Sequence, residues 1–208
     1  MKFTMNMRLL KAVVCGASKE ETRYYLKGVC FEPKAEAIYL CSTDGHMLIA
    51  ARHEHEPDER PEQDLPAFII PLDLIKSLKL NKAIDLGTVE MVNGLVSLHY
   101  FGTSITAPIV DGTFPDWRRV VPDTINGAVA HYNPRLAVRF SDARDALVGK
   151  DSKACPQIHH NGDNPALVSF GIAGERYEIV GVIMPMRGSD DAPIYSWAKH
   201  RPWESKAA

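Results

Sequence analysis

Residues 38–52, which read Ile-Tyr-Leu-Cys-Ser-Thr-Asp-Gly-His-Met-Leu-Ile-Ala-Ala-Arg, decide how this chain folds. Two apolar runs flank Asp44-Gly45. An Asp-Gly pair between such runs predicts a tight β-hairpin, because glycine accepts a positive φ and aspartate tolerates it. The runs are rich in Ile, Leu and Ala, so we expect the hairpin to be largely buried. Thr43, Asp44 and His46 then share one turn beside an apolar surface, which suits a catalytic site, a metal site or a docking surface.

The composition is that of an ordinary soluble globular protein. The chain has 208 residues, 45% of them hydrophobic and 24% charged, enough for one large or two small domains. No apolar run approaches the roughly 18 residues that span a membrane, and the N-terminal residues do not resemble a signal peptide. The four cysteines lack CxxC spacing. We therefore expect a cytoplasmic protein without disulfides and without a membrane partner.

The net charge of −2 hides an uneven distribution. Residues 54–64 carry six acids and one base. The three stretches with helical patterns and their flanks (7–27, 72–82 and 134–153) together carry thirteen bases and six acids. The sequence therefore argues against a uniformly basic surface but allows one basic face formed by helices.

The order of the expected elements repeats three times as strand, helix, strands. In the first unit we expect a strand, a helix, a β-rich segment, the hairpin and an acidic loop at 3–5, 7–17, 22–32, 38–52 and 54–66. In the second we expect a strand, a helix and three strands at 67–71, 72–80, 88–92, 95–100 and 104–110. In the third we expect a strand at 128–132, a helix that begins at Asn133-Pro134, a loop at 151–165, and strands at 167–172 and 177–186.

Four blocks carry a resemblance to a known family. They are Arg-Tyr-Tyr-Leu-Lys-Gly at 23–28, Ser-Thr-Asp-Gly-His-Met-Leu at 42–48, Asp-Gly-Thr-Phe-Pro-Asp-Trp-Arg-Arg-Val at 111–120 and Val-Ile-Met-Pro-Met-Arg at 182–187. In this order they resemble the β sliding clamp of bacterial DNA polymerase III. The resemblance implies an α+β fold of DNA-clamp architecture, with repeated strand-helix-strands units and helices on one face of antiparallel sheets.

The resemblance is partial. Residues 1–122 resemble the complete middle domain of the family, and residues 127–188 resemble the second half of its last domain. The first domain and the first half of the last domain have no counterpart. Residues 189–208 form a polar tail without a counterpart.

In the family, clamp domains close a ring around duplex DNA, and helices line its hole. The resemblance therefore implies sequence-independent contact with DNA phosphates. The residues expected to face DNA are Arg8, Lys11, Arg23, Tyr24, Lys76, Lys79, Arg135 and Arg139. The alternative is that these are ordinary solvated faces of helices.

The family also binds short peptides of polymerases and clamp loaders in a groove between its middle and last domains. Carried over residue by residue, the groove consists of Leu26, Thr43, Gly45, His46, Leu48, Pro115, Arg119, Val120, Asn133, Val182, Met184, Pro185, Met186 and Arg187. Methionine suits a pocket that accepts several peptides, because its side chain is flexible and polarizable. Met47, Leu136 and Gly188 depart from the residues that the family often has.

Two chemical alternatives start from the histidines. Asp44 and His46 could form a catalytic pair, but no nucleophile motif accompanies them and the turn accounts for Asp-Gly. His53, His55, His159 and His160 could bind a metal, but such pairs without a third ligand are usually solvent-exposed. We expect no catalytic residue, metal or cofactor.

The sequence thus supports two functions. The first is a non-catalytic, shortened sliding clamp, of phage or mobile-element type, that docks polymerase and loader peptides and encircles duplex DNA as a homo-oligomer. Two third units would complete one domain, which predicts a dimer or a tetramer. The second is a peptide-binding adaptor or decoy that captures clamp-binding motifs without forming a ring.

Overall fold

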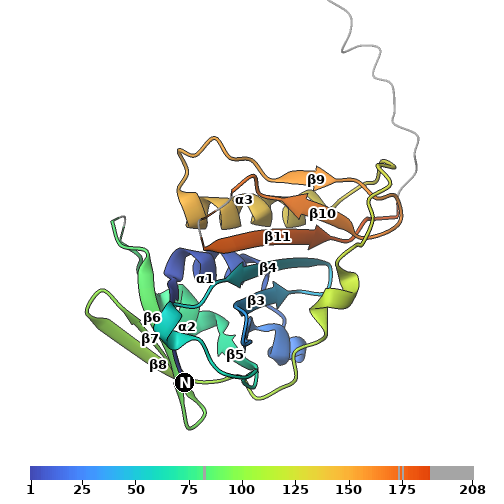
Figure 1. Ribbon diagram of the computed structural model, residues 1–208. Coiled ribbons are helices and arrows are strands. Elements are labelled where there is room, and N and C mark those ends of the chain that lie inside the picture. Colours follow the sequence, from blue (N-terminus) through green and yellow to red (C-terminus); the bar gives the residue numbers. More distant parts are fainter. Residues whose placement is uncertain (82, 173, 175, 188–208) are drawn as a thin grey trace, which may run out of the picture.

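The computed structural model describes residues 1–81, 83–172, 174 and 176–187, so the expected tail lies outside the described residues. Two antiparallel sheets form the fold (Figure 1). The smaller has the order β1 (Lys2–Asn6), β6 (Leu86–Val92), β7 (Leu95–Tyr100), β8 (Thr103–Pro108). The larger has the order β5 (Phe68–Pro71), β2 (Gly28–Pro33), β3 (Ile38–Thr43), β4 (Met47–His53), β11 (Tyr177–Ile183), β10 (Ala166–Ser169), β9 (Gln157–His159).

Each of the three units contains one α-helix, which comes after β1, after β5 and after residues 128–132. The helices are α1 (Met7–Val13), α2 (Leu72–Ser77) and α3 (Pro134–Val148), and the 3₁₀ turns are Val14–Gly16, Glu21–Leu26, Pro57–Glu59 and Trp117–Val120. Side-chain caps begin α1 at Asn6 and α3 at Asn133, the second with proline at the first helical position. The expected fold class, α+β with antiparallel sheets, is confirmed. No helix among the described residues is long and apolar enough to cross a membrane.

The seven-stranded sheet is buried on both faces around β4. Met47, Ile49 and Ala51 belong to the main core, with residues of α1 and α3, which pack against each other under this sheet (Figure 1). Leu48 and Ala50 belong to a second cluster on the other face, covered by residues between 114 and 121. Alternation of side chains along a strand sends neighbours to opposite faces, which explains why β4 is a continuous apolar run rather than an alternating one.

The structure corrects several expected elements. Residues 21–26 form a 3₁₀ turn rather than a strand, and β2 begins only at Gly28. This turn connects the end of α1 to the sheet and buries Leu26. The expected strand at 128–132 makes only an isolated bridge between His131 and Met186. The expected loop at 151–165 contains β9.

The Asp44-Gly45 turn forms as predicted. The Asp44 Oδ1 accepts hydrogen bonds from the amides of His46 at 2.9 Å and Met47 at 3.0 Å, and Gly45 has φ of 91°. The Thr43 hydroxyl donates to the Met47 carbonyl at 2.6 Å and accepts from the Gly45 amide at 3.0 Å. The polar side chains of this turn therefore serve its own backbone.

Arg139 joins α3 to the first unit. Its guanidinium binds the Asp44 carboxylate and donates to the carbonyls of Cys15 at 2.7 Å and Ala17 at 2.8 Å, at the end of the α1 region. The Arg139 and Asp44 side chains are 21% and 16% exposed, so water screens this pair little. Beside it, the Phe140 ring occupies the space that a Cβ at Gly181 would fill. These contacts hold α3 beneath the joint between β4 and β11.

We expect Arg139→Ala to lower the free energy of unfolding by about 2–3 kcal/mol, because it leaves the Asp44 Oδ2 and the carbonyls of Cys15 and Ala17 without their donor. Urea unfolding followed by circular dichroism measures this. Arg135→Ala is the control on the same helix, because the Arg135 side chain is exposed, and it should change stability by less than about 0.5 kcal/mol. Equal effects of the two changes would contradict the structural role of Arg139.

His53 and His55 are buried, against the expectation that they lie exposed in loops. His53 ends β4, and its Nε2 accepts a hydrogen bond from the Asn6 amide at 3.3 Å. The His55 Nε2 lies 2.6 Å from the Lys34 carbonyl. Burial, as the largest cause, lowers the pKa of His53 below its usual value. The neutral form of His53 is therefore the one that the fold accommodates.

The lowered pKa of His53 predicts a loss of stability in mild acid. Below the usual pKa of about 6.5 the unfolded chain binds a proton that the folded chain excludes, so stability is full above that pH and declines as the pH falls through it. Thermal unfolding between about pH 5 and pH 7.5 measures the slope. His53→Gln should flatten it, whereas His46→Gln, at an exposed turn position, should not. An unchanged slope in His53→Gln would exclude His53 as the source.

Candidate functional site

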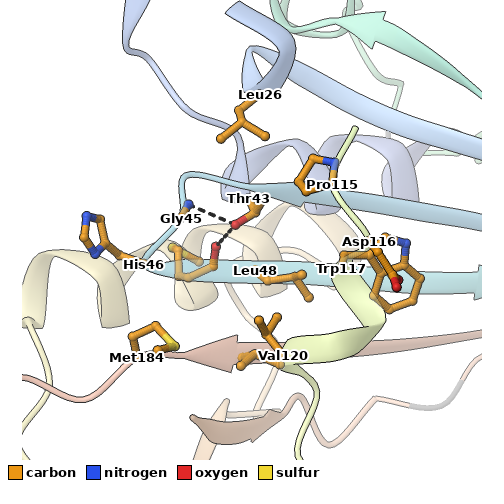
Figure 2. A pocket seen from close by; sticks show the side chains of 12 residues that line it. Leu26, Thr43, Gly45, His46, Leu48, Pro115, Asp116, Trp117, Val120 and Met184 are labelled. Atoms are coloured by element: carbon orange, nitrogen blue, oxygen red, sulfur yellow. Dashed lines mark hydrogen bonds between the residues drawn. The ribbon is translucent and has the colours of Figure 1, made fainter. Parts of the chain in front are cut away.

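A hollow of about 210 Å³ lies where β4, β11 and the 3₁₀ turn at Trp117–Val120 meet (Figure 2). Its lining residues come from four separate parts of the chain. They are Leu26, Thr43, Gly45, His46, Met47, Leu48, Pro115, Asp116, Trp117, Val120, Val182 and Met184. Most of these side chains are apolar, so the hollow suits the apolar side chains of a ligand.

The floor of the hollow is made by the pairing of β4 with β11. Leu48 and Val182 face each other across these strands and are each 2% exposed. The buried side chain of Leu26 lies near them, and Figure 2 shows Leu26, Pro115, Val120 and Met184 arranged around Leu48. The floor is therefore rigid, because it is part of the sheet.

One wall is fixed to the sheet by Glu32. Its carboxylate accepts hydrogen bonds from the Trp117 Nε1 at 3.1 Å and from the Arg118 Nη1 at 2.9 Å. The Arg118 guanidinium lies over the Trp117 ring at 4.3 Å and over the Tyr39 ring at 4.9 Å. This network holds the 3₁₀ turn in place and leaves Val120, 40% exposed, at the edge of the hollow.

The opposite rim consists of His46 and Met184. The Met184 amide donates to the His46 carbonyl at 2.9 Å, which extends the contact between the two strands beyond their named ends. The Met184 side chain is 37% exposed, and an unbranched thioether adapts its shape to different partners. The hollow thus combines a fixed apolar floor with an adaptable rim.

Nine of the fourteen groove residues expected from the sequence line this hollow. The other five do not: Arg119, Asn133, Pro185, Met186 and Arg187. Asn133 instead caps α3, accepting from the Arg135 amide at 3.0 Å, and the Met186 amide donates to the His131 carbonyl at 2.7 Å.

Met47, Asp116 and Trp117 also line the hollow, although they are not among the fourteen residues expected from the sequence. Asp116 and Trp117 belong to the Phe-Pro-Asp-Trp turn at 114–117, inside one of the four quoted blocks, and the sequence predicts this turn as the edge of the groove. No signal distinguished Met47, because its side chain belongs mainly to the core on the other face of the sheet.

The residues expected to face DNA divide into two groups. Arg23, Tyr24, Lys76, Lys79 and Arg135 are exposed. Arg8 forms an ion pair with Asp85, and the Lys11 Nζ donates to the Lys76 carbonyl at 2.9 Å. Burial, as the largest cause, lowers the pKa of Lys11. Arg8, Lys11 and Arg139 therefore make contacts within the chain, and the exposed Arg23 also pairs with Glu20 at 3.5 Å. The basic face that is left for a partner is smaller than the sequence predicts.

Contacts within the protein account for the side chains that were considered for a catalytic pair or a metal site. The Asp44 carboxylate serves its own turn and Arg139. The His159 Nε2 lies 2.8 Å from the Ser169 hydroxyl, and the His160 Nδ1 accepts from the Ala130 amide at 3.1 Å. In the part of the chain that the structure describes, no group of three or more His, Cys, Asp or Glu side chains could hold a metal ion.

Comparison with known proteins relates this chain to one protein family. Residues 3–116, more than half of the chain, match the family of the DNA polymerase III beta subunit, central domain. The Beta sliding clamp of Escherichia coli K12 is 29% identical over 119 residues, which are 55% of this chain and 31% of that protein. The Beta sliding clamp of Pseudomonas putida KT2440 is 30% identical over 148 residues, 69% of this chain and 38% of that protein.

Solved structures show the same fold. The sliding clamp of Bartonella birtlesii bound to griselimycin has a TM-score of 0.67 at 21% identity, covering 90% of this chain and 66% of that one. The DNA polymerase III beta subunit of Thermotoga maritima has a TM-score of 0.66 at 17% identity, covering 91% and 66%.

The matched region spans about a third of the length of the curated relatives. The family match lies within residues 1–122, and the boundaries of the two expected domains stay predictions. Taken with the antiparallel sheets and the four blocks, the match to residues 3–116 shows that this chain belongs to the family of the DNA polymerase III β subunit, the bacterial sliding clamps.

Proposed function

We propose that this protein is a non-catalytic, shortened sliding clamp that docks short peptides of polymerases and clamp loaders. One observation carries the proposal: nine residues chosen from sequence blocks far apart in the chain line a single apolar hollow. Residues brought together from 26, 43–48, 115–120 and 182–184 are not required to meet by local structure alone. A common binding role accounts for their arrangement.

The chemistry of the hollow defines the ligand. Its floor of Leu48, Val182 and Leu26 accepts apolar side chains, and it offers few polar partners. His46 is exposed at the rim of the hollow, where it can offer a polar contact to a ligand. A short extended peptide with one or two large apolar residues fits this pattern, because the buried side chains supply affinity while its backbone stays partly in water.

We expect Met184→Ala to weaken peptide binding about fivefold, which corresponds to roughly 1 kcal/mol of lost apolar contact. Fluorescence anisotropy with a labelled clamp-binding peptide measures this, and griselimycin serves as a second probe. Met186→Ala is the matched control, because Met186 is also exposed but lies outside the hollow. It should change the affinity less than about twofold. Equal affinity of Met184→Ala and the unchanged protein would remove the hollow from the proposal.

The second part of the proposal is encirclement of duplex DNA by an oligomer of this chain. Lys76 and Lys79 on and beside α2, with Arg135 on α3, are exposed cations on helices. The helices lie on the face of the large sheet opposite to the hollow. Phosphate attraction by such residues needs no reading of bases, and it weakens steeply with salt.

We expect the double change Lys76→Glu with Lys79→Glu to reduce DNA affinity at least tenfold at low salt and to lower the salt dependence, since two phosphate contacts are lost. The control is Lys2→Glu with Arg60→Glu, which changes the charge equally at exposed positions away from the helices. Filter binding at several salt concentrations measures both. Equal losses in the two proteins would mean that net charge, not a helical face, governs binding.

The alternative function is a peptide-binding adaptor that forms no ring. The contacts of Arg8, Lys11 and Arg139 within the chain favour it, because they reduce the basic face. Retention on DNA separates the two functions. A ring stays on closed circular DNA and slides off when the circle is cut, whereas an adaptor shows no such difference.

A further inference from the structure

The first two units of this chain exchange strands. The strand before each helix leaves its own unit and pairs with a strand after the helix of the other unit. β1 pairs with β6, and β5 pairs with β2. Each unit therefore gives one strand and receives one, and neither sheet is complete without the other unit.

The third unit repeats the start of this arrangement. The Ile69 carbonyl of β5 accepts from the Val110 amide at 3.0 Å, just after the last strand of its own unit. At the equivalent place before α3, the His131 carbonyl accepts from the Met186 amide at 2.7 Å, just after β11. Ile69 and His131 each lie two residues before the N-cap of the following helix. One edge of residues 128–132 therefore contacts the segment after β11, just as one edge of β5 contacts the segment after β8.

The other half of the exchange is missing. β9 pairs with β10, and among the described residues no strand lies along its outer edge, at the end of the large sheet (Figure 1). With the described residues, 128–132 make no strand pairing beyond the bridge at His131, although the Ala128 carbonyl accepts from the Gly162 amide at 2.8 Å. Only residues 123–127 separate this segment from the expected first domain at 1–122. Five residues are too few to supply another strand and helix.

The third unit also leaves apolar surface uncovered. Five of the seven residues of α1 are buried, but only three of the fifteen residues of α3. Val129 is 82% exposed and Val138 57%. These features are expected of a unit that lacks its neighbour.

We propose that a second copy of this chain completes the third unit by reciprocal strand exchange. Residues 128–132 of each copy pair antiparallel with the outer edge of β9 of the other. The occupant is a second copy because each chain, in its described residues, has no strand along the outer edge of β9 and carries a segment before α3 that could pair there. This is the condition for a two-fold symmetric interface. This pairing supplies the oligomer that the DNA part of the proposed function needs, and the peptide-binding hollow does not depend on it.

The geometry identifies the residues that face the partner. Backbone groups of successive residues in a strand point to opposite edges. The His131 carbonyl points to Met186, so His131 and Val129 face their own unit. Ala128, Ala130 and Tyr132 face the opposite edge, where the Ala128 carbonyl accepts a hydrogen bond from the Gly162 amide of the same chain at 2.8 Å. The Ala130 amide indeed points away from Met186, toward the His160 ring beyond the end of β9. A proline at 130 therefore removes a donor from this edge, together with its bond to the His160 ring, and a proline at 129 removes neither.

Sedimentation velocity of the full chain at micromolar concentration tests the pairing. The unchanged protein and Val129→Pro should sediment as dimers of a 23.1 kDa chain, and Ala130→Pro as a monomer. A monomeric unchanged protein would overturn the proposal, as would equal dimerisation of the two proline variants. Circular dichroism checks that both variants are folded.

Hydrogen exchange on the unchanged protein gives a second test that needs no variant. Amides of residues 128–132 and 157–159 should exchange more slowly at high than at low protein concentration. Concentration-dependent protection confined to β8 would assign the dimer to a different edge and contradict the exchange. Peptide affinity of monomeric Ala130→Pro should equal that of the dimer, so a failure of the docking proposal shows separately from a failure of this one.

Discussion

The pairing of β4 with β11 is the contact on which the rest of the molecule depends. Seven residues of each strand face each other, from Tyr177 opposite His53 to Ile183 opposite Met47. This register joins the third unit to the first in one sheet. It also decides which side chains share a face: Leu48 and Val182 meet on the side of the hollow, while Met47 and Ile183 meet in the main core. A slip by one residue would move each set to the other face and remove the floor of the hollow.

The two faces of this sheet carry the two proposed activities. Helices α1 and α3 cover one face, and the 3₁₀ turn at Trp117–Val120 covers part of the other. The turn leaves a hollow because it is held by Glu32 at one end of the face rather than lying across Leu48. Contact with DNA through the helices and contact with a peptide through the hollow therefore do not compete for the same surface.

The sequence predicted the local features of this site well and the distant ones only through the family blocks. Asp44-Gly45 predicted its hairpin because the turn depends on hydrogen bonds and backbone angles within residues 43–47, which are close in sequence. The pairing of β4 with β11 joins residues more than a hundred positions apart, and no local pattern specifies it. Arg139 shows the same limit: the resemblance implied that it faces DNA, but tertiary contacts with Asp44, Cys15 and Ala17 enclose it. The segment at 21–26 was mistaken for a strand because its tyrosines and leucine suit strands equally well.

The backbone N–H and C=O groups at a sheet edge without a neighbouring strand need hydrogen-bond partners, from another strand or from water. In residues 1–108 the exchange is internal, so both partners are held at high effective concentration by the chain itself. In the third unit the segment before α3 stays beside its own β9, where the Gly127 amide donates to the His160 carbonyl at 3.1 Å, without entering the sheet. That contact holds the segment near the edge at little entropic cost while keeping the Val129 side chain in water. Strand exchange between two copies adds strand pairing and apolar burial, but it costs the translational entropy of one chain. The equilibrium between the monomer and the proposed dimer therefore depends on the concentration of the chain.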